Sequence, residues 1–463
     1  MLQVVQAFDG EPIAELAFDE AADCERKLQA ATRAFGDKGG RLKPYQRVEI
    51  LRRLATRVAD RRDHFAMQIA REGGKPLSDA VVETTRAIDG IMNAADELRN
   101  FAGREIPMGL SLASVDRVAF TTKEPIGVVC AISAFNHPLN LIVHQVVPAI
   151  AVGCPVIVKP AAATPLSCID LVTSVREAGL PEDWCQTFIP SSTELAERLA
   201  TDPRVAFLSF IGSANVGWNL RSKLARGTRA ALEHGGAAPV IVDRSADLDR
   251  IIDPIVKGGY YHAGQVCVSI QRIFVHDDIA ASFTEQLVRR VEKLRVGDPT
   301  LAETEVGPLI RPREVDRVLS WIEEAVAGGA RLATGGARIS ATTLKPAVLV
   351  DPPRQAKVSR EEVFGPVVCV YPYADLDEAI ARANSLPVAF QASVFADDID
   401  VALHAAEHLD ASAVMINDST SFRTDWMPFA GRRESGYGVG GIPYTMRDMT
   451  EEKMTVLVRR GIR

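Results

Sequence analysis

Three short segments carry side chains that could act together on a carbonyl group. Cys267 lies among small or flexible residues in the segment 263–269, outside any amphipathic pattern, and an accessible thiolate is a strong nucleophile. Glu233 follows a predicted strand and precedes two glycines, where a carboxylate could accept a proton. Asn136 also follows a predicted strand, and its amide could donate to an oxyanion. Together these groups are suited to covalent chemistry at a carbonyl.

Each of these residues also has an ordinary structural interpretation. Cys267 could be a buried structural thiol, Glu233 a solvated loop acid, and Asn136 a turn residue before His137. A fourth segment, 210–217, follows a strand and opens a helix. Gly212 has no Cβ, so a diphosphate could approach its backbone, but the Gly-x-Gly-x-x-Gly pattern is missing and a plain helix start is equally consistent.

The order of elements indicates how these side chains are positioned. Residues 19–101 have helical patterns, and residues 103–124 read as an extended ribbon. Short apolar strands then alternate with helices. The predicted strands are 127–133, 155–159, 205–209, 229–232 and 240–243, continued after residue 264 by 270–276, 367–371 and 412–416. The predicted helices include 165–177, 215–225, 279–296, 313–327 and 376–385. This alternation predicts an α/β fold with parallel sheets and two domains that meet near residues 234–265.

Composition excludes several classes of protein. The chain has 463 residues, which exceeds one ordinary domain, and its 47% apolar and 24% charged residues are typical of globular proteins. The net charge of −7 argues against nucleic-acid or anionic-membrane partners, and no apolar run reaches bilayer length. Seven scattered cysteines without metal-ligand spacing, and no visible signal peptide, predict a reduced cytoplasmic protein without a metal.

Taken together and in this order, the motifs resemble the non-acylating NAD(P)-dependent aldehyde dehydrogenase superfamily, over about residues 18–458. The segments that carry the resemblance are EPIGVV (124–129), SAFNHP (133–138), VIVKP (156–160), FIGS (210–213), LEHGG (232–236), GQVC (264–267), EEVFGP (361–366), MPFAG (427–431) and ESGYG (434–438). The chain departs from the usual pattern where Ala134-Phe135 replaces Pro-Trp, His234 replaces Leu, and Ala430 replaces Gly.

The resemblance implies two Rossmann-like α/β domains and a small β segment for oligomerisation. Residues 1–105 and 126–235 would bind the dinucleotide, and residues 236–446 would form the catalytic domain. Residues 106–125 and 447–463 would associate into a homodimer or homotetramer.

The resemblance also implies roles for the reacting groups. Cys267 would attack an aldehyde to form a thiohemiacetal, whose oxyanion Asn136 would hold. After hydride transfer, Glu233 would activate the water that hydrolyses the thioester. A relative that passes the acyl group to coenzyme A is an alternative, although Glu233 argues against it, and a catalytically silent binding protein on the same fold is another.

The same resemblance assigns the cofactor site to NADP or NAD. The implied cofactor residues are Ser133, Phe135, Lys159, Ala162, Gly212, Ser213, Glu362 and Phe364. Ala162 stands where NAD-preferring members commonly have Glu, which repels a 2′-phosphate. We therefore expect NADP to be used, with NAD still accepted.

The last expectation concerns the aldehyde. The resemblance places Arg86, His137, His144 and Arg423 at the substrate tunnel. Such a tunnel would favour a short aldehyde bearing a carboxylate, sulfonate, phosphonate or phosphate, such as succinate semialdehyde, sulfoacetaldehyde or phosphonoacetaldehyde. In the structural alternative, Arg86 belongs only to a helix surface and Arg423 pairs with Asp425.

Overall fold

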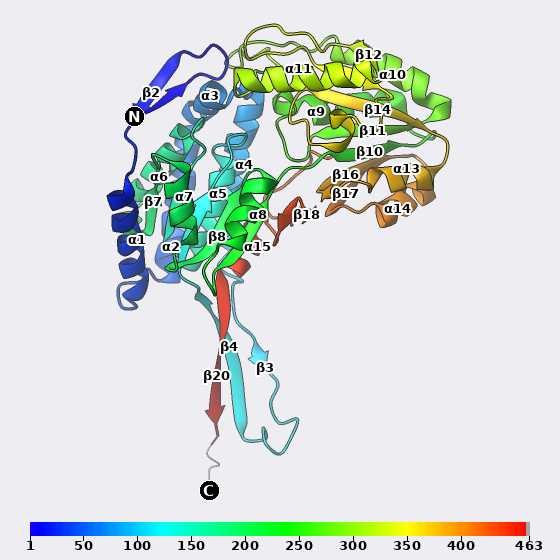
Figure 1. The fold of residues 1–463 in the computed structure, drawn as a ribbon. Coiled ribbons are helices and arrows are strands. Elements are labelled where there is room, and N and C mark those ends of the chain that lie inside the picture. Colours follow the sequence, from blue (N-terminus) through cyan, green and yellow to red (C-terminus); the bar gives the residue numbers. More distant parts are fainter. Residues whose placement is uncertain (460–463) are drawn as a thin grey trace.

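Two sheets, one in each lobe, organise the chain, and a third sheet projects away from both lobes (Figure 1). The computed structural model describes residues 1–459. Residues 460–463, the end of the predicted oligomerisation segment 447–463, lie outside this range. No helix within the described range is long and apolar enough to cross a membrane.

The first sheet has the strand order β19-β9-β8-β5-β6-β7 and is parallel except for its β19 edge. Its strands are β5 (Val128–Ile132), β6 (Val156–Lys159), β7 (Cys185–Thr187), β8 (Val205–Ile211), β9 (Arg229–Glu233) and β19 (Gly436–Tyr437). The helices of this lobe are α1 (Ala21–Gly36), α2 (Pro44–Asp60), α3 (Arg62–Gly73), α4 (Leu77–Glu97), α5 (Asn140–Val152), α6 (Leu166–Glu177), α7 (Thr193–Thr201), α8 (Ala214–Ser222) and α15 (Ile442–Asp448), with a 3-10 turn η1 (Glu182–Trp184).

The second sheet has seven strands in the order β12-β13-β14-β11-β10-β16-β17. Its strands are β10 (Ala238–Val242), β11 (Ile270–His276), β12 (Arg331–Thr334), β13 (Ala347–Val350), β14 (Val367–Tyr373), β16 (Gln391–Phe395) and β17 (Ala413–Ile416). The helices of this lobe are α9 (Leu248–Tyr260), α10 (Asp277–Val291), α11 (Pro312–Ala327), α12 (Lys357–Arg360), α13 (Leu376–Ala383) and α14 (Ile399–His408), with a 3-10 turn η2 (Tyr261–Gly264). Only β12 runs antiparallel to its neighbour in this sheet.

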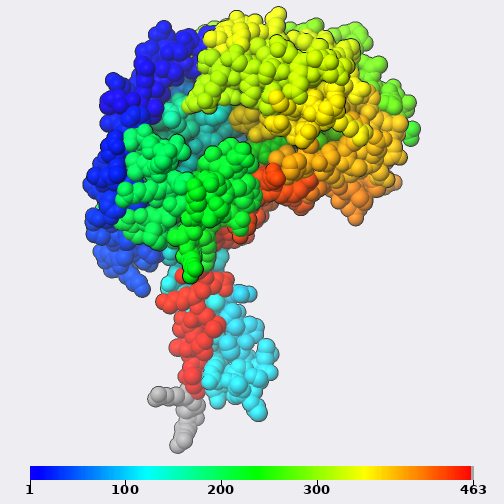
Figure 2. Space-filling view, in the orientation of Figure 1, coloured from blue at the N-terminus to red at the C-terminus, as the bar shows by residue number. Residues whose placement is uncertain are grey.

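The third sheet is a long ribbon of β4 (Arg117–Pro125) and β20 (Thr450–Val458), to which β3 (Glu105–Ile106) adds a short edge. The two long strands pair antiparallel over their whole length. Figure 2 shows the ribbon standing clear of both lobes in this view. The remaining strands pair as β1 (Leu2–Val5) with β2 (Pro12–Leu16), and as β15 (Val388–Ala389) with β18 (Arg432–Arg433).

The predicted alternation of strands and helices is confirmed, with three differences in detail. Strand 240–243 continues the first series in sequence, but β10 lies in the second sheet between β11 and β16. The helix predicted over 279–296 ends at Val291, because the backbone at Arg295 and Val296 pairs with residues 305–306 instead. The N-terminal hairpin β1–β2 was not predicted, since its few residues lack a clear alternating pattern.

The predicted domain boundaries place residues 436–446 with the second lobe. In the structure, β19 pairs with β9 of the first sheet, and α15 packs on α5. Gly436 permits the pairing, because a Cβ there would lie 2.6 Å from the Leu232 carbonyl oxygen. The chain therefore returns to the first lobe before it enters the ribbon.

Candidate active site

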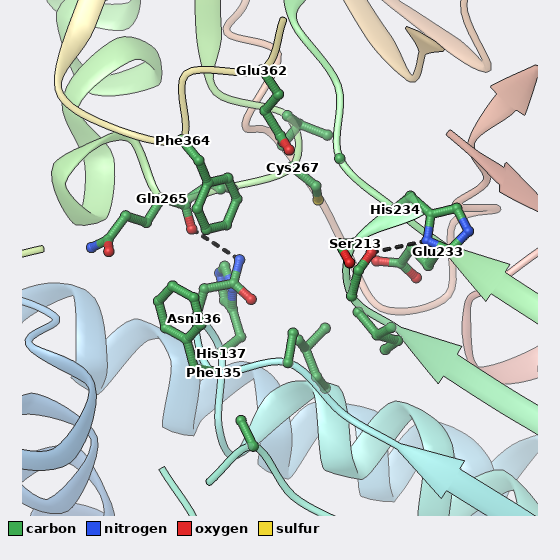
Figure 3. Close-up of a pocket in the computed structure, with 18 of the residues that line it drawn as sticks. Phe135, Asn136, His137, Ser213, Glu233, His234, Gln265, Cys267, Glu362 and Phe364 are labelled. Atoms are coloured by element: carbon green, nitrogen blue, oxygen red, sulfur yellow. Dashed lines mark hydrogen bonds between the residues drawn. The ribbon is translucent and has the colours of Figure 1, made fainter. Parts of the chain in front are cut away.

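A single cavity of about 1530 Å³ runs between the two lobes, and every residue predicted for catalysis, cofactor or substrate lines it. The first lobe contributes the carboxyl ends of its parallel strands, where ligands of open α/β sheets bind. Lys159 ends β6, Glu233 ends β9, and Asn136 follows β5. Cys267 comes from the second lobe, between η2 and β11. Figure 3 shows Cys267, Glu233 and Asn136 projecting into this space from their separate elements.

A tight turn holds Cys267 in the cavity wall. His262 and Ala263 adopt left-handed backbone angles, with φ of 48° and 55°, and Gly264 follows at 71°. Gly264 cannot be larger, because a Cβ would lie 2.1 Å from the Gly365 carbonyl oxygen. Such strained segments persist where the surrounding structure fixes them, often at functional sites.

The surroundings of Cys267 favour the protonated thiol. Burial raises the pKa of Cys267 well above its ordinary value, and the carboxylates of Glu233 and Glu362 raise it further. Arg423 acts in the opposite direction. The thiol therefore needs a base to become a nucleophile, and the site contains one.

Glu233 has the properties of such a base. Burial raises the pKa of Glu233 to about 7, while the positive charge of Arg423 lowers it. Its carboxylate makes no hydrogen bond with the described residues, so both oxygens are available to a thiol or a water. A carboxylate with a pKa near neutrality is well matched to proton transfer.

The Asn136 amide is oriented by the loop that carries the thiol. Its Nδ2 donates to the backbone oxygen of Gln265 over 2.9 Å, which Figure 3 marks. The Gln265 side chain is itself held, because Oε1 accepts from the Ile310 amide and Nε2 donates to the Pro308 carbonyl. Gln265 lies within the quoted GQVC motif, but only the structure shows that it joins Asn136 to the Cys267 loop.

The part of the cavity lined by Lys159, Gly212 and Ser213 has the features of a dinucleotide site. The Lys159 ammonium is partly buried and, within residues 1–459, bonds only to the Pro160 carbonyl, so N–H groups remain for a ribose or phosphate. Beside it lie the small residues 161–163. Gly212 and Ser213 form the turn that begins α8, and the N-terminus of a helix favours a phosphate.

Glu362 and Phe364 line the same cavity, and Figure 3 shows both near Cys267. Glu362 accepts from the Gly236 amide over 3.0 Å, and burial raises its pKa to about 7. Phe364 packs edge-on against Phe135, with ring centroids 5.8 Å apart. The volume of the cavity exceeds that of an ordinary small-molecule pocket. A dinucleotide beside an aldehyde fits this volume, the unpaired Lys159 ammonium and the turn at the start of α8.

The four side chains predicted for the substrate are not equivalent. Arg86 donates to Asp425 over 2.8 Å, and His144 Nε2 lies 2.7 Å from the same carboxylate. Asn140 also donates to Asp425, over 3.1 Å. Although burial opposes it, the bonds from His144 and Arg86 hold the pKa of Asp425 below its ordinary value. Arg86 is thus neutralised by its partner.

Arg423 has no such partner. The alternative in which it pairs with Asp425 is wrong, because Arg86 occupies that carboxylate. Within the described chain the Arg423 guanidinium makes no ion pair, its Nη1 is buried without a hydrogen-bond acceptor, and it stacks 3.5 Å from the Phe429 ring centroid. Burial lowers the pKa of Arg423 to about 10, so it stays charged at neutral pH.

The remaining two predicted residues are uncharged imidazoles. Burial lowers the pKa of His137 well below its ordinary value, and it lowers the pKa of His144 as well. His137 lies beside Tyr261, whose hydroxyl is 3.5 Å from its Nε2.

The sequence analysis did not assign Asp425 or Asn140 to the site. The only signal for Asp425 was its position two residues after Arg423.

Known proteins resemble the chain over its whole length. The model of the aldehyde dehydrogenase family matches residues 1–455. A 3-sulfolactaldehyde dehydrogenase of Priestia aryabhattai is 36% identical over 98% of this chain and 94% of its own length.

Two solved structures share the fold closely. The structure of aldehyde dehydrogenase 21 from Physcomitrella patens, in complex with the reaction product succinate, has a TM-score of 0.96 and 35% identity, and the match covers 100% of this chain and 95% of that one. A glyceraldehyde-3-phosphate dehydrogenase from Methanocaldococcus jannaschii, complexed with NADP, has a TM-score of 0.94 and 32% identity over 99% of both chains.

Proposed function

This chain belongs to the aldehyde dehydrogenase family, and we propose that it oxidises a short anionic aldehyde to the carboxylate, with NADP or NAD as the hydride acceptor. The observation that carries the choice of substrate is the unpaired Arg423 guanidinium in the cavity wall. A buried charge without a partner costs free energy, and an anionic group on the substrate would remove that cost. An apolar aldehyde would leave the Arg423 charge unpaired, and the free-energy cost would remain.

The relatives support the same class of substrate. The 3-sulfolactaldehyde dehydrogenase is named for an aldehyde that carries a sulfonate. The Physcomitrella patens aldehyde dehydrogenase is described with succinate as its reaction product. Carboxylate and sulfonate groups both offer oxygens that a guanidinium can bind in a bidentate manner.

The geometry accounts for the chemical steps. Glu233 takes the Cys267 proton directly or through a water, and the thiolate attacks the aldehyde carbon to give a thiohemiacetal. The Asn136 amide and the Cys267 backbone N–H hold the oxyanion, and one such donor contributes about 3 kcal/mol. Glu233 passes the Cys267 proton to solvent, and as a carboxylate again it removes a proton from the water that attacks the thioester. The proton then returns to the leaving Cys267 sulfur, and the product acid ionises to the carboxylate.

A dinucleotide bound in this cavity would supply a nicotinamide ring as the hydride acceptor. Lys159 and Ala162 would face its adenosine ribose, Gly212 and Ser213 its diphosphate, and Glu362 and Phe364 its nicotinamide ribose. Ser133 and Phe135 complete the wall.

Because Ala162 neither accepts from a 2′-hydroxyl nor repels a 2′-phosphate, Ala162→Glu should weaken NADP binding much more than NAD binding. Equal losses for both dinucleotides would contradict this assignment.

The assembly is also part of the proposal. The exposed ribbon presents apolar side chains to solvent, among them Phe120, Met454, Val456 and Leu457. An uncovered apolar surface of this kind favours association, so we propose a homodimer or homotetramer built through β4 and β20 in a reduced, cytoplasmic enzyme. Light scattering should give a mass at least twice that of the chain.

One assay tests the proposed activity. Absorbance of the reduced nicotinamide should rise with succinate semialdehyde or sulfoacetaldehyde, and the rate should exceed that with propanal or benzaldehyde at equal concentration. The rate should not require coenzyme A. A strict requirement for coenzyme A would instead favour an acylating enzyme, and absence of any rate would favour a silent binding protein.

A further inference from the structure

His234, the residue directly after Glu233, is a buried imidazole in contact with the dinucleotide end of the cavity. The residue is 2% exposed. Nδ1 lies 2.9 Å from the Gly212 carbonyl oxygen, a contact that Figure 3 marks beside Ser213. None of the reaction steps derived above uses this ring.

The hydrogen bond defines the tautomer of His234. A carbonyl oxygen can only accept, so Nδ1 carries the proton and donates it. Nε2 is buried without a partner within residues 1–459. A second proton there would be an unpaired buried donor, and burial accordingly lowers the pKa of His234 although the Gly212 bond opposes this. The ring therefore remains neutral with Nδ1–H.

Two aromatic rings contact the imidazole, one edge-on and one tilted. Phe210, on β8, lies 5.7 Å from it, and Trp218, on α8, lies 5.9 Å from it. Its edge fills the space beside Gly217, because a Cβ on Gly217 would lie 2.0 Å from His234 Cε1. Among the described residues of β8 and α8, the one charged side chain is that of Arg221, which lies 5.4 Å from the Trp218 ring, and Glu233 precedes His234 in the chain.

Gly212 is consequently bound through both of its backbone polar groups. Its amide donates to the Glu233 carbonyl over 3.0 Å, and its carbonyl accepts from His234. A glycine is the residue whose backbone most easily rotates, so these two bonds are what determine the orientation of the turn. The next residue, Ser213, is the N-cap of α8.

We propose that His234 is a positioning residue for the dinucleotide: its Nδ1–H holds the Gly212 carbonyl and keeps the Gly212–Ser213 turn in the orientation that receives the diphosphate. This inference rests on the proposed function, because it takes this turn as the diphosphate seat. It adds that the segment 233–234 performs two tasks, with Glu233 facing the thiol and His234 facing the dinucleotide. The strand end thereby links the two halves of the cavity.

Two substitutions separate the hydrogen bond from the bulk of the ring. His234→Leu keeps an apolar side chain of similar size but removes the donor. His234→Asn places an amide N–H close to the position of Nδ1, so it can restore the bond to Gly212. We expect His234→Leu to weaken NADPH binding about tenfold, and His234→Asn to stay within about threefold of the unmodified protein.

The measurement is a titration of the protein with NADPH and NADH in the absence of aldehyde, followed by nucleotide fluorescence. The rate of Cys267 alkylation by iodoacetamide is the control, and it should be alike in all three proteins. Nitrogen-15 spectra of labelled histidine should contain the signal of a neutral Nδ1–H ring that is present in the unmodified protein and disappears in both variants.

The outcomes distinguish the two proposals. If the unmodified protein binds neither dinucleotide, the proposed function fails. If it binds them but His234→Leu binds equally well, or His234→Asn is as weak as His234→Leu, the role of His234 is overturned. Should His234→Leu fail to fold, Gly217→Ala decides, since its Cβ must displace the ring: weaker NADPH binding supports the proposal and unchanged binding overturns it.

Discussion

Arg86 and Arg423 line the same cavity, but within the described chain Arg86 forms an ion pair and Arg423 does not. Arg86 belongs to a paired cluster in which Arg86, Asn140 and His144 all bond to Asp425. Arg423 belongs to a reactive cluster with Asn136, Glu233 and Cys267, in which the acid and the guanidinium interact by charge without a hydrogen bond between them.

From this difference we expect the chemistry to take place in the cluster around Cys267. A buried ion pair whose hydrogen bonds are satisfied contributes to a wall of fixed shape. Its two charges neutralise each other, so neither is available to a substrate. Groups that are buried and left without partners cost stability, and they persist where a substrate or a transition state will engage them. The four predictions below test whether the two clusters divide in this way.

The largest effect should come from the nucleophile. Cys267→Ala removes the only sulfur of the reactive cluster, so aldehyde oxidation should fall about ten-thousandfold or more while NADPH binding is retained. Steady-state rates and a nucleotide titration measure the two properties. Cys369→Ala, at a fully buried cysteine in β14, is the matched control and should keep the activity. Substantial turnover by Cys267→Ala would assign the chemistry to another group.

The next effect concerns the base. Glu233→Gln cannot accept a proton from water, so the thioester should persist and the steady-state rate should fall about 100-fold or more. Rapid mixing should show a burst of reduced nicotinamide close to the enzyme concentration, followed by slow turnover. Steady-state turnover equal to that of the unmodified enzyme would remove Glu233 from the mechanism.

The third prediction compares the two arginines directly. Arg423→Met should lower kcat/KM for succinate semialdehyde about 100-fold, chiefly through KM, and should change the value for propanal only a few-fold. Arg86→Met should lower kcat/KM for succinate semialdehyde less than tenfold, because Asp425 already occupies its guanidinium. If Arg86→Met had the larger effect, the paired cluster would be the anion site.

The smallest effect is a shift in pH dependence. The pKa of Glu233 is about 7, so turnover of propanal should rise as the pH rises through that value and the carboxylate forms. Arg423 lowers the pKa of Glu233, and its loss in Arg423→Met should therefore move the rise in turnover to higher pH. Propanal is used so that anion binding does not contribute. A rise that stayed in place or moved to lower pH would show that the two charges are not coupled.

The sequence alone predicted much of the fold and of the site. Glu233 and Lys159 end their strands and Asn136 follows its strand. The carboxyl ends of parallel strands meet at one edge of a sheet, so the convergence of these residues follows from local patterns. The prediction that Cys267 is reactive rested on its small neighbours and, above all, on the family motif that contains it. Boundaries were less certain, as the end of α10 at Val291 shows, because a helix stops where the next backbone pairing begins.

Pairing, burial and proton affinity were decided only by the tertiary structure. Arg86 meets Asp425 across 339 positions of the chain, and nothing near either residue predicts that bond or the isolation of Arg423. Likewise, Glu233 is an ordinary acid by its sequence, and only desolvation between the lobes raises its pKa to about 7. Residue type determines which reactions are available, whereas charge balance and solvent access depend on neighbours that folding brings from distant parts of the chain.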